Sequence, residues 1–184
     1  MNSILKEYIV SDMHRYFGSE RISLKTRIFM PLEIKYIITF RKAQFSSFKF
    51  IRTYYKFKLW MISRKTMIQI PASTRIGKGF YIGHCGRIII NPNAVLGENV
   101  NIATGVTIGQ ENRGYRKGSP IIGNNVWIGT NAVVVGKIKI GDDVLIAPNA
   151  YVNFDVPSHS IVLGNPAKIH PRDNATDGYV CRKI

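Results

Sequence analysis

The sequence predicts a mainly β protein: a triangular coil of short parallel strands, preceded by a small helical region. Aliphatic residues return every six positions between Ile70 and Val152, and glycine or alanine follows most of them. A period of six fits neither a helix of 3.6 residues per turn nor a strand that alternates every second residue. It fits a coil in which each hexad forms one flat side and three hexads complete a turn. The inward-pointing residues run in three phases: Ile70, Ile76, Ile82; Ile90, Leu96, Ile102, Ile108; and Ile122, Ile128, Val134, Ile140, Ile146, Val152.

This periodicity divides the chain into three parts. Residues 1–67 lack it, are basic, and are expected to hold two or three helices separated at Pro31. Residues 68–154 form the coil, from which the segment 109–121 is expected to protrude as a loop because it holds no inward-pointing residue until its end. Residues 155–184 are expected to be an irregular closing segment and tail, with prolines ending regular structure.

Charge and composition limit the partners and the cellular compartment that fit this chain. The formal net charge is +15, and no acidic residue occurs between Glu33 and Glu98, so this block should attract anions. Two cysteines, Cys85 and Cys181, cannot form a disulfide framework, which favours a reducing compartment. The first residues do not resemble a signal peptide, and no apolar run reaches about 18 residues. We therefore expect a cytoplasmic protein.

Among the four histidines, only His84 lies in the repeat region, directly after Gly83. A neutral imidazole suits a general base because its unperturbed pKa of about 6.5 lies near working pH. Backbone N–H groups at a corner of the coil could stabilise an oxyanion. So few histidines argue against a three-histidine zinc site, and no metal is expected. Cys85 and His84 are adjacent, and neighbouring residues on a strand face opposite sides, so they are not expected to form a Cys-His nucleophile. Cys85 is expected to pack instead.

Three stretches resemble the hexapeptide-repeat acyltransferases: YIGHCGRIIINPNAVLGENVNIATGVTIG (81–109), PIIGNNVWIGTNAVVVGKIKIGDDVLIAPNAYV (120–152) and DVPSHSIVLGNPAKI (155–169). The similarity is to the serine acetyltransferase-like branch, closest to colanic-acid and capsule polysaccharide O-acetyltransferases. It implies a left-handed parallel β-helix, a homotrimer, and acetyl-CoA lying in a groove between neighbouring coils. It also implies direct acetyl transfer with His84 as the catalytic base. The positions that match CoA contacts of the family are Thr130, Pro148, Asn153 and Lys168.

The chain departs from the serine acetyltransferase pattern at the acceptor side. Gln69 stands where that pattern has the Asp that orients the catalytic histidine, and Gly83 stands where it has a second Asp. Gly118 and Ser119 replace an Arg-His pair. The resemblance implies that these groups bind the ammonium and carboxylate of serine, and this chain lacks them. We therefore expect the acceptor to be a sugar hydroxyl of a capsule, exopolysaccharide or lipopolysaccharide precursor. Serine O-acetylation is the alternative, and a non-catalytic scaffold or binding module is the third hypothesis.

The basic segment 34–67 interleaves lysines and arginines with aromatic residues and holds no acid. Cationic and aromatic groups together favour peripheral contact with an anionic membrane surface. These aromatics could instead pack beneath the coil or between subunits. Nucleic acid is not an expected partner, because the segment has no recognisable reader motif and charge alone gives nonspecific affinity.

Overall fold

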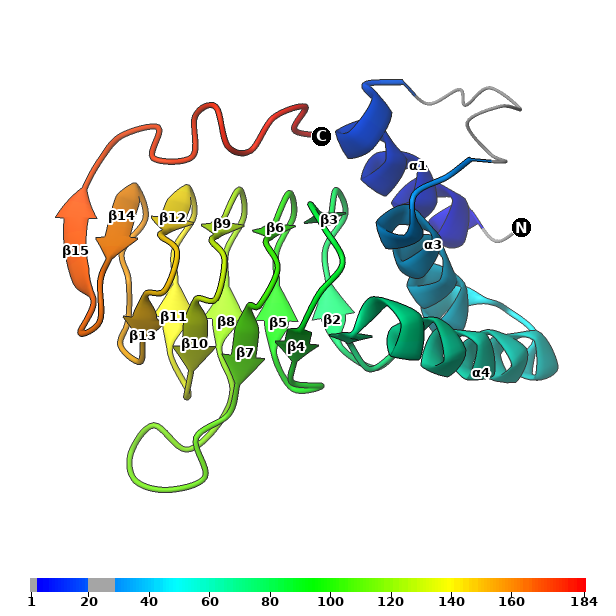
Figure 1. The fold of residues 1–184 in the computed structure, drawn as a ribbon, viewed down its shortest axis with the longest axis horizontal. Helices are drawn as coiled ribbons and strands as arrows, with labels where there is room; N and C mark the ends of the chain where they lie inside the picture. The colour runs from blue at the N-terminus through cyan, green and yellow to red at the C-terminus, as the bar shows by residue number, and fades with distance from the viewer. Residues whose placement is uncertain (1–2, 20–28) are drawn as a thin grey trace.

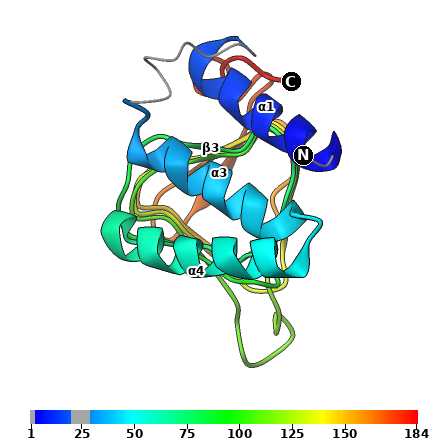
Figure 2. The same ribbon diagram turned by 90° about the vertical axis from the view of Figure 1, so that its right-hand side faces the viewer.

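A computed structural model describes residues 3–19 and 29–184 of the chain. It shows a parallel β coil with helices at one end (Figure 1). The helices are α1 (Ser3–Phe17), α3 (Leu32–Phe45) and α4 (Lys49–Thr66). Seen along the coil axis, they lie side by side across its end, with α3 between α1 and α4 (Figure 2). The predicted fold class, a parallel β-helix preceded by helices, is confirmed.

Three sheets form the three sides of the coil, named here sides A, B and C. Side A consists of β1 (Ile68–Gln69), β4 (Ile88–Ile90), β7 (Thr107–Gly109), β10 (Val133–Val135) and β13 (Tyr151–Val152). Side B consists of β2 (Arg75–Ile76), β5 (Val95–Leu96), β8 (Ile121–Ile122) and β11 (Lys139–Ile140). Side C consists of β3 (Tyr81–Ile82), β6 (Asn101–Ile102), β9 (Trp127–Ile128), β12 (Val144–Ile146), β14 (Ser160–Leu163) and β15 (Lys168–Pro171).

The lumen of the coil is the hydrophobic core. Ile82 is in register with Ile102, which is in register with Ile128, and all three side chains are almost completely buried. The same stacking repeats on the other sides. The residue two places before each of these positions, such as Val100 or Val126, is buried as well, so most hexads contribute two apolar side chains to a continuous column. The burial of these side chains is the main favourable term for folding of this region. The six-residue period therefore marks side chains that point into the lumen.

The glycines after the inward-pointing residues of side B are required by close stacking of the turns. A Cβ on Gly97 would lie 2.6 Å from the carbonyl oxygen of Gly123, and one on Gly77 would lie 2.5 Å from that of Gly97. Neither Gly77 nor Gly97 has a positive φ angle, so close approach of the next turn, and not backbone conformation, requires glycine here. The positive φ angles occur two residues further on, mostly at asparagines and otherwise at glycine or aspartate: Asn99, Asn125, Asn131, Asn149, Gly79, Gly105 and Asp143.

The coil extends beyond residue 154, where the sequence pattern was expected to stop. Strand β14 pairs in parallel with β12, and β15 then returns antiparallel to β14. Val156 and Val162 carry the buried positions of this last turn. The expected irregular segment therefore begins with one more turn. Between β7 and β8, residues 110–120 leave the coil as a loop (Figure 1).

Side chains from the helices satisfy the open edges of the first coil turn. On side A the Tyr36 hydroxyl accepts the N–H of Ile70 at 3.0 Å. On side B the Arg41 guanidinium donates to the carbonyls of Ile76 at 2.8 Å and Gly77 at 2.6 Å. On side C the Tyr16 hydroxyl donates to the carbonyl of Ile82 and accepts its N–H. Unpaired strand edges invite pairing with other chains, and here side chains of α1 and α3 bind exposed backbone groups of the first turn.

After β15 the chain runs back along side C towards α1 (Figure 1). Asp143 holds the start of this tail by accepting the N–H groups of Ala175 and Thr176 and the Thr176 hydroxyl. Burial alone would raise the pKa of Asp143, but hydrogen bonds from Thr176, His159 and Ala175 together lower the pKa to about 2. A depressed pKa means that this clamp contributes stability above about pH 4 and loses it as the pH falls towards 2.

Candidate active site

His84 lies at an enlarged corner between sides C and A. Eight positions separate the lumen residues Ile82 and Ile90 of the first turn, whereas six separate their partners Ile102 and Ile108 in the next. The two extra residues widen this corner, and the His84 side chain is exposed there. The slip in the six-residue pattern was therefore the sequence signal for a special corner.

All three helices contact the backbone of this corner. The Tyr16 hydroxyl of α1 donates to the carbonyl of Ile82 and accepts its N–H. The Glu33 carboxylate of α3 accepts the N–H of Cys85 at 3.0 Å. The N–H of Gly86 donates to the carbonyl of Thr66 at 2.9 Å. The sequence patterns did not reveal Tyr16 and Glu33, because the two residues lie 66 and 52 positions from their partners.

Two of the four expected CoA contacts lie in line with His84. The corners that follow β3, β6, β9 and β12 stack along the coil and form a row of four residues, named here the corner ridge: His84, Thr104, Thr130 and Pro148. Hydrogen bonds join its turns, from Asn131 N–H to the Thr104 carbonyl and from Asn149 N–H to the Thr130 carbonyl. At about 4.8 Å per turn, Pro148 lies about 14 Å from the level of His84. An extended pantetheine chain could follow this ridge.

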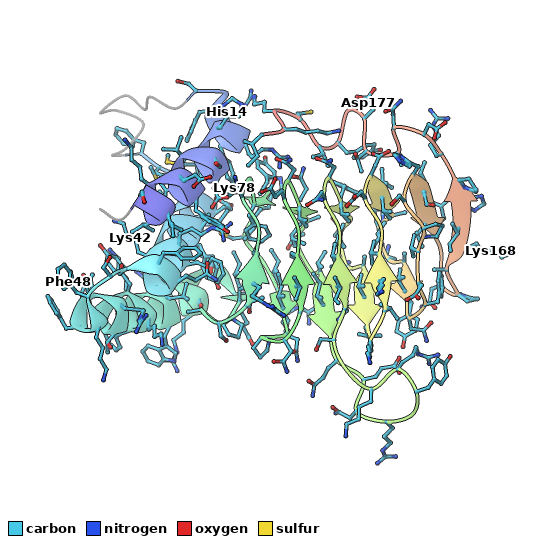
Figure 3. All side chains as sticks on the ribbon, turned by 180° about the vertical axis from the view of Figure 1, so that it is seen from behind. His14, Lys42, Phe48, Lys78, Lys168 and Asp177 are labelled. Atoms are coloured by element: carbon cyan, nitrogen blue, oxygen red, sulfur yellow. The ribbon has the colours of Figure 1, made fainter. Side chains whose placement is uncertain are left out.

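The other two expected contacts differ in position. Lys168 pairs with Leu163, the last residue of β14, and lies exposed at the end of the coil far from the helices (Figure 3). Its ammonium therefore lies beyond the end of the corner ridge, where it could bind a phosphate group. Asn153 follows β13 and lies at the corner between sides A and B. Within one chain, Asn153 is thus on a different corner from His84.

The protruding loop also leaves from the corner between sides A and B. Ser119 at its end donates to the Asn91 side chain at 3.1 Å. Arg116 donates to both carboxylate oxygens of Glu111 at 3.2 Å, so its guanidinium is paired within the loop. Within one chain, this loop and His84 therefore border side A from opposite edges.

Gln69 is not hydrogen-bonded to His84 in the described part of the chain. Its side chain lines a cleft of about 820 Å³ between α4 and the outer face of side A, together with Trp60, Arg64 and Ile89. Among the described residues, no hydrogen bond joins Gln69 to His84. The orienting role that the resemblance gave to an Asp at position 69 therefore has no counterpart in Gln69.

Cys85 packs partly against the hydrophobic core, as expected. Burial, with the nearby Glu33 carboxylate as a second cause, raises the pKa of its thiol to about 11. Such a thiol is almost entirely protonated near neutral pH and is a poor nucleophile. Within the two described stretches, no group of three histidine, cysteine or acidic side chains is arranged to hold a metal ion.

Comparison with known proteins agrees with this architecture. Residues 119–153 match the model of the bacterial transferase hexapeptide (six repeats). The chain therefore contains hexapeptide repeats, as its six-residue period predicts. The solved structures similar to it include soybean serine acetyltransferase without ligands (TM-score 0.77, 26% identity, covering 92% of this chain and 70% of that chain). They also include Neisseria gonorrhoeae serine acetyltransferase (TM-score 0.76, 26% identity, covering 94% and 68%).

Curated relatives similar to this chain are also named serine acetyltransferases. A serine acetyltransferase of Helicobacter pylori is 38% identical over 108 residues, covering 59% of this chain and 63% of the relative. One from Staphylococcus aureus is 39% identical over 113 residues, covering 61% and 53%. Serine acetyltransferase 4 of Arabidopsis thaliana is 37% identical over 125 residues, covering 61% and 35%. The matched segment thus spans between about a third and two thirds of these relatives.

These relatives correct the expectation about the acceptor. The expected closeness to capsule and colanic-acid enzymes, and with it a saccharide acceptor, was wrong, since the relatives at 35–39% identity and the similar structures are named serine acetyltransferases. The departures at Gln69, Gly83 and Ser119 are differences within that similarity.

Proposed function

We propose that this hexapeptide-repeat chain transfers the acetyl group of acetyl-CoA to the hydroxyl of serine, with His84 as general base. The observation that carries the proposal is the exposed His84 at the head of the corner ridge, on a coil similar to serine acetyltransferases. A thioester is already activated, so the site has to deprotonate the hydroxyl and hold both reactants in line. Thr130 and Pro148 would lie along the CoA chain, and Lys168 near its phosphates.

A panel of acceptors tests this function. Release of free CoA from acetyl-CoA is measured with L-serine, L-homoserine, serinamide and N-acetylserine. We expect L-serine to give the highest kcat/KM, and the two blocked forms to show whether the ammonium or the carboxylate of serine is recognised. Release that is no faster with L-serine than without an acceptor would reject the proposal.

We also propose that the active enzyme is a homotrimer. Within one chain, His84 and Lys168 lie at the corner between sides C and A, whereas Asn153 and the protruding loop lie at the corner between sides A and B. A second copy beside the first would bring both sets to one groove and give it a second wall. Light scattering should report three chains of 20.8 kDa or a multiple of three, and an active monomer would contradict this.

The outer face of α4 supports a third proposal, peripheral binding to an anionic membrane surface. Phe50, Tyr54, Phe57 and Met61 follow one helical face, with exposures of 74%, 57%, 58% and 48%, and Leu59 is buried on the opposite face. The helix carries six lysines and arginines and no acid. Each basic group near such a surface contributes on the order of 1 kcal/mol. None of the described helices is both long and apolar enough to span a bilayer.

Liposome flotation measures this binding. The chain should float with anionic vesicles at low salt and not with neutral ones, and salt should weaken the binding. Phe50→Ser/Phe57→Ser should abolish flotation. Tyr115→Ser is the matched control, because Tyr115 is an aromatic residue of the protruding loop with 87% exposure. Equal flotation of both variants, or none by the wild type, would show that the aromatic face of α4 does not bind lipid.

A further inference from the structure

A carboxylate from outside the coil holds the corner that carries His84. Glu33 lies in the first turn of α3, and its Oε1 accepts the backbone N–H of Cys85, the residue after His84, at 3.0 Å. A hydrogen bond to an ionised acceptor is about twice as strong as one between neutral groups. The Glu33 side chain is half-buried, so solvent screens this contact only partly.

The other contacts of the corner join neutral groups. Tyr16 binds the backbone of Ile82, the Thr104 hydroxyl lies 3.4 Å from the Cys85 carbonyl oxygen, and Gly86 donates to Thr66. Among these contacts of the described residues, Glu33 supplies the one ionised group. It also acts on the residue directly beside His84, on the side where Cys85 packs against the core.

The two positions at which the resemblance implies a carboxylate near His84 hold none in this chain. Gln69 is uncharged and lines the cleft beneath α4, and Gly83 has no side chain. A general base has to be held close to its productive position, because a displacement of about 1 Å can cost about 10²-fold in rate. This site therefore needs another means of fixing its histidine.

We propose that Glu33 is the positioning residue of this site. By accepting the Cys85 N–H, it fixes the enlarged corner and so fixes the direction in which the exposed His84 meets the acceptor hydroxyl. The inference rests on the proposed acetyl transfer, and it makes α3 part of the active site. Glu33 does not itself touch the reacting atoms.

Two substitutions separate positioning from simple stability. Glu33→Ala removes the acceptor of the Cys85 N–H, and we expect kcat to fall about 10–100-fold with the KM for acetyl-CoA unchanged. Glu33→Gln keeps an acceptor oxygen at the same reach and should keep kcat within about threefold of the wild type. Glu7→Ala is the matched control, since Glu7 is an exposed carboxylate of α1 that pairs with Lys78. It should turn over at the wild-type rate.

The contact can also be measured without any turnover. The negative charge of Glu33 and its hydrogen bond help to raise the pKa of the Cys85 thiol. In a Cys181→Ser background, iodoacetamide should therefore alkylate Cys85 faster in Glu33→Ala than with Glu33 present, and Glu7→Ala should leave the rate unchanged. The alkylation rate still tests the Glu33–Cys85 contact if serine proves not to be the acceptor.

Wild-type kcat in Glu33→Ala would overturn the inference. So would a failure of Glu33→Gln to restore kcat when both variants lose thermal stability in parallel, because Glu33 would then be structural only. A wild type that releases no CoA with serine rejects the proposed function instead. In that case unchanged alkylation of Cys85 in Glu33→Ala also overturns the Glu33 contact, and faster alkylation supports it.

Discussion

His84→Ala is expected to lower kcat for acetyl transfer about 10²–10⁴-fold, which is the usual cost of losing a general base. The side chain is exposed at its corner and makes no hydrogen bond among the described contacts, so its removal should leave the fold and its stability nearly unchanged. Steady-state release of CoA gives kcat, and calorimetric titration with acetyl-CoA shows whether cofactor affinity is kept.

His159→Ala is the control for loss of an imidazole. His159 is exposed at the opposite end of the coil and contacts Asp143, so its loss should not change kcat. A His84→Ala enzyme that retains most of its turnover would show that another group, or solvent, takes the proton of the acceptor.

Arg41→Ala is expected to destabilise the chain by about 3–5 kcal/mol, the usual cost of removing one partner of a buried ion pair. Arg41 is completely buried and lies 2.7 Å from Asp12, which is itself buried. Its loss leaves the Asp12 carboxylate without its counter-charge and the carbonyls of Ile76 and Gly77 without a donor. Such a loss is a large share of the roughly 5–15 kcal/mol that stabilises an ordinary domain.

Urea unfolding measures this change. Arg52→Ala, which removes an exposed arginine of α4, should stay within about 0.5 kcal/mol of the wild type. If Arg41→Ala unfolds at the wild-type midpoint, the helices do not stabilise the open end of the coil through this pair.

The coil could be predicted from the sequence because its physics is local. Each lumen position is set by a residue six places from the last, so Ile82, Ile102 and Ile128 could be read directly. The turn containing β14 was missed because the pattern slips by two residues between Val152 and Val156, and Ser158, His159 and Ser160 follow. The general base remains a prediction from the sequence that the exposed, enlarged corner supports.

The contacts between the helices and the coil could not be predicted. Tyr16, Glu33 and Arg41 reach partners that lie 66, 52 and 35 positions away, and no periodicity links them. In the sequence, Asp12 and Arg41 resemble ordinary surface charges of helices. Only the packing of α1 and α3 across the coil end shows that they are buried.

Mass spectrometry of the products formed from L-serine and acetyl-CoA tests the central claim most directly. The account predicts that serine gains one acetyl group for each CoA released, and that His84→Ala forms this product at least about 10²-fold more slowly. Free acetate in place of O-acetylserine, or equal product from the wild type and His84→Ala, would contradict it.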